Sequence, residues 1–388
     1  MANKIINKIG RIIRNTRRII PGLENRRRMF PMNPIDDLQT VHPWMIKLYI
    51  NAECNARCVM CDIGLKNRES VFYQQVKQDK GALFSVGDCS ALIEEVKSFK
   101  PQINIHGLEP LLHPNILGLI SIIKRQGLYI YLVTNGILLA PLAQALIELG
   151  VDMIAVSIDG PRLIHDQIRG RGIYEKATEG IRLLRHWRSK LKKDHIKIAA
   201  ACTISDWNHH SLKEYADTML AGVQVDHIRF LHLSFVTEDV SKIHNDRYCA
   251  WGKSSAVNTG RVDPAKIDTD ILWDQIKYLK REFDDNRISF NHEFTNKKKL
   301  ALFLKNPDRF VDQHNCMVPW DSATILANGD MIISNRCFTY KTGNLHEQSF
   351  NAIWNGERYQ DFRRALKKTG YFPTCVRCCG TYAGSPIK

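Results

Sequence analysis

Three cysteines lie within eight positions of the segment 51–64, NAECNARCVMCDIG. Cys54, Cys58 and Cys61 have the spacing C-x3-C-x2-C and follow a short apolar run at 45–50. A strand that ends in such a loop can direct three sulfur atoms to one metal centre. Structural zinc sites usually pair two C-x2-C arms, whereas thiolates are the standard ligands of iron–sulfur clusters. The spacing therefore favours a cluster with one iron left open, and zinc or buried thiols are the alternatives.

The rest of the chain suggests a reducing environment for these thiols. The 388 residues include eleven cysteines and carry a net charge of +15. The beginning of the chain lacks the uninterrupted apolar run of a signal peptide, and the most apolar stretch, 137–151, is broken by Pro141, Gln144 and Glu148. We therefore expect a cytoplasmic protein, in which cysteines more often bind metal or act in catalysis than form disulfides.

Residues 1–40 are expected to form a basic arm followed by a linker. The first 28 residues contain nine Lys and Arg against one acid, and isoleucines recur at helical spacing. This pattern is typical of a helix that lies on an anionic membrane surface or an acidic partner, and a solvated arm is the alternative. Contact at the inner membrane surface is thus one expectation. Because the arm has no interleaved aromatic residues, we expect no nucleic acid partner.

Apolar strands and amphipathic helices alternate between residues 41 and 236. Strands are predicted at 45–50, 103–107, 129–136, 152–160, 196–205 and 225–236, and helices at 89–99, 116–127, 139–150 and 173–193. Such alternation is typical of parallel βαβ units and predicts an α/β barrel or open sheet. Asp88 is predicted to cap the first helix. Residues 237–310 look like a less regular connector, and 311–388 like a small domain with a hairpin turn at 327–330.

Four short motifs follow these strands: HGLEP at 106–110, TNG at 134–136, VSIDG at 156–160 and HDQIRG at 165–170. Together with the cysteine spacing they resemble the radical S-adenosylmethionine (SAM) superfamily. The resemblance implies a partial (β/α)6 TIM-like barrel, a [4Fe-4S] cluster held by Cys54, Cys58 and Cys61, and SAM on the open iron. In that family, reductive cleavage of SAM yields a 5′-deoxyadenosyl radical. The electron would come from a reductant such as flavodoxin or ferredoxin.

The resemblance also assigns residues to the cofactor site. Met60 stands where relatives commonly have an aromatic residue, and Leu108 replaces a glycine of the HGLEP motif. The Glu109 carboxylate would face the SAM ammonium group, and Arg169 would pair with the SAM carboxylate. The residues predicted to bind the cofactor are Met60, Gly107, Glu109, Pro110, Asn135, Ser157, Asp159 and Arg169.

A second group of cysteines occupies the last 73 residues: Cys316, Cys337, Cys375, Cys378 and Cys379. Their arrangement, with GNLHEQSFNAIWNGE at 343–357, resembles the SPASM and twitch extensions of radical SAM enzymes. Because the full SPASM pattern has seven cysteines, we expect a small α+β twitch-type domain with one auxiliary [4Fe-4S] cluster. Cys316, Cys337, Cys375 and Cys378 are the predicted ligands and Cys379 is left as a spare. A four-cysteine zinc site is the alternative.

A second cluster suits a reaction that needs an electron acceptor. We expect a radical oxidoreductase that performs a two-electron oxidation at a C–H bond of a sugar-like or aminocyclitol metabolite. On the sixth strand, Arg229 and His232 are assigned as catalytic residues that contact the substrate. One alternative is a maturase that crosslinks or epimerises a ribosomal peptide. Another, from a different class, is a zinc-stabilised, non-catalytic binding protein.

Overall fold

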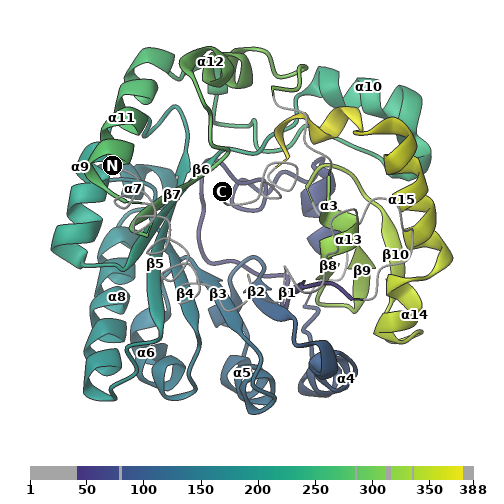
Figure 1. Cartoon of the computed structure of the whole chain (residues 1–388), viewed down its shortest axis with the longest axis horizontal. Helices are drawn as coiled ribbons and strands as arrows, with labels where there is room; N and C mark the ends of the chain where they lie inside the picture. Colours follow the sequence, from purple (N-terminus) through teal and green to yellow (C-terminus); the bar gives the residue numbers. More distant parts are fainter. Residues whose placement is uncertain (1–41, 78–80, 285, 312–315, 334–335, 379–388) are drawn as a thin grey trace, which may run out of the picture.

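The structure, a computed structural model, describes residues 42–77, 81–284, 286–311, 316–333 and 336–378. Its strands form one sheet in the order β10-β9-β8-β1-β2-β3-β4-β5-β6-β7, which curves into an open ring with helices around it (Figure 1). The strands are β1 (Met45–Tyr49), β2 (Gln102–His106), β3 (Ile130–Thr134), β4 (Met153–Ser157), β5 (Lys197–Ile204), β6 (His227–His232), β7 (Ile288–Asn291), β8 (Ser322–Ile325), β9 (Asp330–Ile332) and β10 (Lys341–Asn344).

Neighbouring strands from β8 through β1 to β7 are parallel, so the predicted α/β class and partial TIM-like barrel are confirmed. The outer face of β1, with Ile46 and Leu48, is fully buried, whereas the alternate positions are partly exposed. Side chains of a strand alternate between its two faces, so the apolar set packs against the helices and the other set points into the barrel.

Helices cover the outside of the barrel (Figure 1). The α-helices are α3 (Val71–Lys77), α4 (Val86–Val96), α5 (Ile116–Arg125), α6 (Leu139–Glu148), α7 (Arg162–Arg169), α8 (Ile173–Lys190), α9 (Leu212–Asp217), α10 (Glu238–Tyr248), α11 (Thr269–Glu282), α12 (Lys297–Lys305), α13 (Val318–Asp321), α14 (Phe350–Trp354) and α15 (Glu357–Thr369). A π-helical turn, Thr218–Val223, continues α9. In the described ranges, no helix is both long enough and apolar enough to cross a bilayer.

The connector contributes to the barrel, which the sequence did not predict. Strand β7 pairs in parallel with β6 and adds a seventh strand at the edge of the sheet. The connector also contains the helices α11 and α12. The boundary drawn at residue 236 therefore cuts through one continuous sheet, because the short run ISFN was not recognised as a strand.

The C-terminal segment is joined to the barrel through its own strand. Strand β8 pairs in parallel with β1, and β9 and β10 continue the sheet in antiparallel fashion. The predicted hairpin turn at 327–330 links β8 to β9, with Gly329 at a φ of 82°. Since β1 has β2 on one side and β8 on the other, the two groups of cysteines belong to a single folded unit.

The start of α4 differs from the prediction. Ser85 is its N-cap, and Asp88 completes a capping box by accepting the Ser85 amide at 3.0 Å. Asp88 thus supports the cap from the third helical position. The predicted basic arm, residues 1–40, lies outside the described residues.

Candidate active site

The loop that carries the first three cysteines begins at the carboxyl end of β1 and is tied to the end of β2. The Asn51 side-chain amide donates to the Glu109 carbonyl at 2.8 Å, and the Glu109 amide donates to the Glu53 carbonyl at 2.9 Å. Further on, a Cβ at Gly64 would lie 2.6 Å from the Cys58 nitrogen. A larger residue could not pass so close to backbone atoms, so this glycine lets the loop fold back on its cysteines.

The thiols of Cys54, Cys58 and Cys61 form one electrostatic group. Burial raises the pKa of Cys54 and raises that of Cys58 to about 12, and the charge of Cys61 adds to both shifts. Arg169 opposes the shifts and donates to the Cys58 sulfur at 3.8 Å. A thiolate at such a buried position needs a positive partner, and bound iron would be one.

The three thiols lie close enough for the charge of Cys61 to add to the raised pKa of Cys54 and Cys58. Within the described ranges, no group of three His, Cys, Asp or Glu side chains has the geometry of a single bound metal ion. Each thiolate of a cubane cluster binds a different iron, so cluster ligands need not converge on one point. Metal analysis distinguishes the cluster from the zinc alternative.

Glu109 is fully buried and engages three donors of its own chain. One carboxylate oxygen accepts the Leu111 amide at 3.0 Å and the Thr134 hydroxyl at 2.7 Å, and the other accepts the Asn135 amide at 2.7 Å. Burial raises the pKa of Glu109, although these bonds oppose the shift. The structure therefore shows Glu109 holding the end of β3 against the end of β2. Its direct contact with SAM stays a prediction.

Asn135 connects the end of β3 to the cysteine loop. Its side-chain amide nitrogen donates to the side-chain oxygen of Asn55 at 2.8 Å and lies 3.9 Å from the Cys54 sulfur. Its side-chain Oδ1 accepts the Ile137 backbone amide at 2.9 Å, which fixes the orientation of the side-chain amide. The next residue, Gly136, has a φ of 82° and lies tightly against α8. The TNG motif thus positions an amide donor beside a cluster ligand.

Asp159 and Arg169 form a buried ion pair at the end of β4. Asp159 is fully buried, and the Arg169 side chain is only 13% exposed. The second Asp159 oxygen accepts the Thr203 amide at 2.8 Å, which links β4 to β5. Although burial opposes its charge, the Asp159 carboxylate and Cys58 raise the pKa of Arg169. Asp159 therefore holds the guanidinium towards Cys58, and its predicted contact with the cofactor stays a prediction.

Two residues that the sequence did not single out bind the backbone of Asp159. His165 accepts the Asp159 amide on Nδ1 at 3.0 Å, and burial lowers its pKa to about 4. Asn208 donates to the Asp159 carbonyl at 2.7 Å. His165 is the first residue of the HDQIRG motif, so the sequence could have pointed to it. Asn208 has no local signal, because it reaches Asp159 from 49 residues away.

The remaining predicted cofactor residues occupy varied surroundings. Ser157 ends β4 at a partly exposed position, and its hydroxyl makes no hydrogen bond to a described residue, so it is available to a ligand. Met60 is buried in an apolar cluster with Leu233 and Phe235. Gly107 has a φ of 138°, and Pro110 begins a short 3-10 turn. Gly107 therefore provides a backbone bend that other residues rarely adopt.

Three of the predicted auxiliary ligands lie together. Burial raises the pKa of Cys316 to about 12, and the nearby Cys378 thiol adds to the shift. Cys375 is likewise shifted upward by burial and by both of these thiols. In the described part of the chain, Cys337 is buried but shows no electrostatic interaction with the other three. Its role as the fourth ligand stays a prediction, and Cys379 lies outside the described residues.

Arg377 anchors the segment that carries Cys375 and Cys378. It is 1% exposed and donates to the carbonyls of Phe303 at 2.7 Å and Asn306 at 2.7 Å, at the end of α12. Further donations reach the carbonyls of residues 302, 309 and 376. A positive group at a helix carboxyl end satisfies carbonyls that have no intrahelical partner. The connector thus positions the second group of thiols.

The catalytic role of His232 stays a prediction, and its surroundings give it no support. His232 is 3% exposed and packs among Phe294, Phe303 and His292 outside the barrel, and burial lowers its pKa to about 3. Arg229 lies three positions earlier, and an odd spacing on a strand places two side chains on opposite faces. Arg229 is partly exposed, and its charge helps to lower the pKa of His106 on β2. It therefore points into the barrel.

Comparison with known families agrees with this geometry. The model of the radical SAM superfamily matches residues 48–190, and that of SPASM, an iron–sulfur cluster-binding domain, matches residues 316–379. The chain belongs to the radical SAM superfamily. It is therefore an enzyme that uses SAM and a [4Fe-4S] cluster, and its SPASM-type domain adds auxiliary iron–sulfur binding.

Relatives of known function match most of the chain. The Fe-coproporphyrin III synthase of Methanosarcina barkeri is 23% identical over 349 residues, which cover 84% of this chain and 78% of that protein. A tungsten-containing aldehyde ferredoxin oxidoreductase cofactor-modifying protein of Pyrococcus furiosus is 25% identical over 351 residues, which cover 85% and 86%.

Solved structures share the fold. SuiB of Streptococcus suis bound to S-adenosylmethionine has a TM-score of 0.59 at 12% identity, and the match covers 84% of this chain and 68% of SuiB. The enzyme anSMEcpe with bound AdoMet has a TM-score of 0.58 at 14% identity, and the match covers 88% and 92%. At these identities the likeness supports the barrel and its cluster domain, without indicating a shared substrate.

Proposed function

We propose that this radical SAM enzyme carries out a two-electron oxidation at a C–H bond of a small metabolite. The observation that carries the proposal is the presence of two separate thiol groups in one continuous sheet, one after β1 and one around β8 and α12. When bound, SAM and its cluster would supply a 5′-deoxyadenosyl radical, and an auxiliary cluster would supply an acceptor for the second electron.

The chain's own residues would orient these groups and exclude water. Cys54, Cys58 and Cys61 would hold the first cluster, with Arg169 and Asn135 donating to two of their sulfurs. Donors near a thiolate-bound cluster tune its potential, and their orientation is maintained here by buried partners. Ser157 and the backbone at Gly107 lie at neighbouring strand ends, where ligands bind in parallel α/β barrels.

The choice of a small molecule is supported by the relatives that match most of the chain. The names of both refer to a porphyrin or to another cofactor rather than to a peptide. We propose a sugar-like or aminocyclitol metabolite as the starting hypothesis, with oxidation beside a hydroxyl group.

Peptide modification is the second candidate, because the fold is shared with SuiB bound to its precursor peptide at a TM-score of 0.59.

Two partners complete the proposal. A reductant such as flavodoxin or ferredoxin would deliver the electron that cleaves SAM. Residues 1–40, which lie outside the described residues, would contact an acidic partner or the inner membrane surface through their nine basic side chains.

Iron and sulfide quantification tests the two-cluster assignment. Protein reconstituted under anaerobic conditions should hold about eight irons, and a variant with Cys54, Cys58 and Cys61 all changed to Ala should hold about four. Equal iron content in the two proteins would contradict it.

The substrate class is tested by adding a low-molecular-weight cell fraction and measuring 5′-deoxyadenosine. Stimulation that survives protease treatment supports a metabolite, and stimulation abolished by protease supports the peptide candidate.

A further inference from the structure

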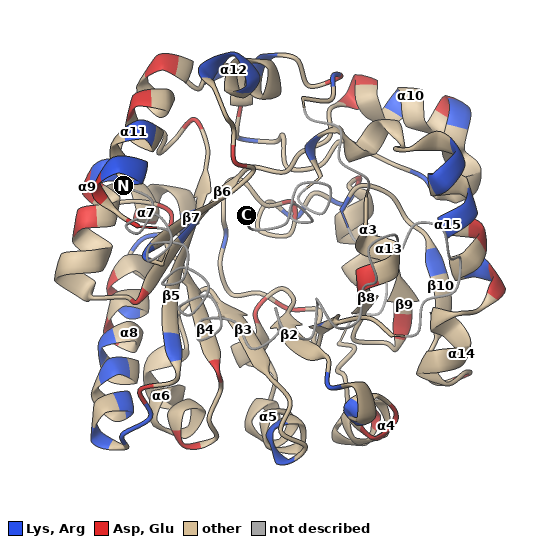
Figure 2. Ribbon diagram, viewed as in Figure 1, with Lys and Arg blue, Asp and Glu red and all other residues tan. Residues whose placement is uncertain are grey.

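The inward positions of the barrel strands carry several positive groups but no acid. The partly exposed positions of β1–β7 include the cations Lys47, Lys197 and Arg229, and none of these positions carries Asp or Glu. Most basic residues lie elsewhere, for example on the outer faces of α8 and α12 (Figure 2). The positive charge inside the barrel is therefore a local feature, distinct from the overall charge of the protein.

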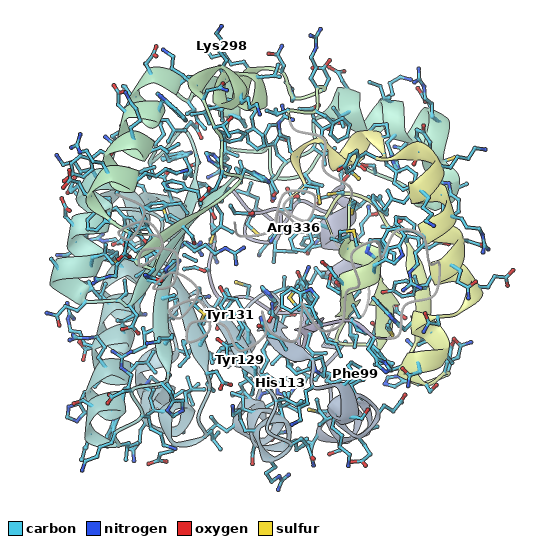
Figure 3. All side chains as sticks on the ribbon, viewed as in Figure 1. Phe99, His113, Tyr129, Tyr131, Lys298 and Arg336 are labelled. Carbon is cyan, nitrogen blue, oxygen red and sulfur yellow. The ribbon has the colours of Figure 1, made fainter. Side chains whose placement is uncertain are left out.

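Three cations from different elements act on the side chain of His106, which lies beside β1 at the position paired with Tyr49. Burial lowers the pKa of His106 to about 3, and Lys47, Arg336 and Arg229 add to the shift. These residues come from β1, from the segment after β9 and from β6, so they surround the interior from different elements. Arg336 also lies over the Phe72 ring at 4.8 Å. Figure 3 shows Arg336 near the centre of the ring of strands.

Two of these cations have no partner in the described part of the chain. Lys47 and Arg229 make no hydrogen bond or ion pair with a described residue, and both are partly exposed. On the outer helix α5, by contrast, Lys124 is paired with Asp152 at 2.6 Å. Unpaired charges that converge in a confined interior repel one another, and a ligand of opposite charge would relieve this cost.

An aromatic wall lies beside the cations. The rings of Tyr49 and His106 stack at 6.4 Å, and His106 meets Tyr131 edge-on at 6.2 Å. These three residues are on β1, β2 and β3, and Tyr131 also borders the interior in Figure 3. The interior thus offers flat apolar surface next to positive charge, which suits a ring that carries acidic substituents.

The position of the cations also connects the two thiol groups. Lys47 pairs with Thr324 on β8, the strand that follows Cys316, and Arg336 directly precedes Cys337. Arg229 pairs through Ala201 with Ser157, the free hydroxyl at the end of β4. The charged interior therefore extends from the auxiliary cysteines to the proposed SAM side.

We propose that Lys47, Arg229 and Arg336 form the substrate site and select a polyanionic small molecule, bound through carboxylate or phosphate groups. This inference rests on the proposed function and narrows its substrate class. A protonated aminocyclitol would be repelled by the same three cations, so the substrate is an acid such as a sugar acid, a sugar phosphate or a ring with carboxylate side chains. Arginine and lysine bind both kinds of anion through charge-assisted hydrogen bonds.

Equilibrium dialysis under anaerobic conditions tests this on the full-length, iron-loaded protein. The probes are benzene-1,3,5-tricarboxylate, fructose 1,6-bisphosphate and, as the cationic counterpart, 2-deoxystreptamine. At least one anion should bind, and more weakly as salt is added. The changes Lys47→Met and Arg229→Met should each weaken its binding about tenfold or more, the usual effect of losing one charge-assisted hydrogen bond. The charge-preserving changes Lys47→Arg and Arg229→Lys should retain most of it.

Lys176→Met, which removes an exposed cation from α8, is the matched control and should leave anion binding unchanged. A preference for the tricarboxylate would identify an organic acid, and a preference for the bisphosphate a phosphate ester. The proposal would be overturned if neither anion bound, if 2-deoxystreptamine bound more tightly, or if the Met variants bound anion as the wild type does.

Iron content shows whether the cations serve cluster binding rather than substrate binding. If Lys47→Met and Arg229→Met lost iron in proportion to lost anion binding, these residues would serve the clusters, and the substrate proposal would be wrong. Formation of 5′-deoxyadenosine from SAM and dithionite without substrate tests the proposed function independently. That activity with no anion binding would refute only the substrate class, whereas anion binding without that activity would refute the proposed function.

Discussion

The ion pair between Asp159 and Arg169 allows a sharp test, because the barrel contains a second ion pair of similar design that serves as a control. In each pair a carboxylate at a strand end accepts an arginine and the amide of a neighbouring strand. Asp159 accepts Arg169 and the Thr203 amide, whereas Asp226 accepts Arg188 and the Ile198 amide. The pairs differ in burial. The Asp159 side chain is fully buried, and that of Asp226 is 27% exposed.

The change Asp159→Asn keeps the shape but removes the charge, so Arg169 is left buried without a counter-ion. Breaking a buried pair on one side costs about 3–5 kcal/mol. For Asp226→Asn, solvent screens the loss and about 1 kcal/mol is expected. Since Asp159 also directs Arg169 towards Cys58, its variant should bind less iron at the first site, whereas Asp226→Asn should bind the wild-type amount.

Urea unfolding of the two variants gives the free energies, and iron quantification gives the second readout. The reasoning would be refuted if the two substitutions destabilised the protein equally, or if Asp159→Asn retained full iron content and wild-type stability. A large loss of stability with full iron would indicate that the pair only supports the fold.

Three further predictions follow from the contacts. Glu109→Gln turns an amide donor towards Thr134 or Asn135 and should reduce the free energy of unfolding by about 1–3 kcal/mol, measured in urea. Gly136→Ala, whose Cβ would lie 2.7 Å from Ala177 of α8, should destabilise by more than Gly150→Ala, whose nearest contact is 3.9 Å; equal melting temperatures would contradict this. Asp330 has a lowered pKa, because bonds from Lys341 and other donors outweigh its burial. The stabilisation by ionised Asp330 is therefore present above about pH 4 and lost as the pH falls through the lowered pKa. The difference in free energy of unfolding between the wild type and Asp330→Asn should decrease over that pH range.

The sequence predicted the barrel well because its strands are buried on their helix-facing side. Runs such as 129–136 and 196–205 are apolar and end in recognisable turns, so both their type and their approximate limits could be predicted. Strand β7 was missed because it is only four residues long and lies in a polar connector. The pairing of β8 with β1 joins residues 322 and 45, and no local pattern reports such a contact.

The site shows the same division between local and long-range information. Motif spacing identified Glu109 and Asp159, yet their carboxylates turn out to hold other residues, because the donors come from neighbouring strands. Arg229 and His232 were assigned together, although their odd spacing on one strand places them on opposite faces. Lys47 and Arg336 were not predicted at all, since only the folded sheet brings their charges near His106.

Reductive cleavage of SAM is the property on which the assignment of this chain depends. Protein reconstituted under argon is given SAM and dithionite, and 5′-deoxyadenosine is quantified by chromatography. The wild type should form 5′-deoxyadenosine, and Cys58→Ala should not. An exposed-thiol control, Cys249→Ser, should behave as the wild type. Iron-loaded wild-type protein that never yields 5′-deoxyadenosine would show that the chain is not a working radical SAM enzyme.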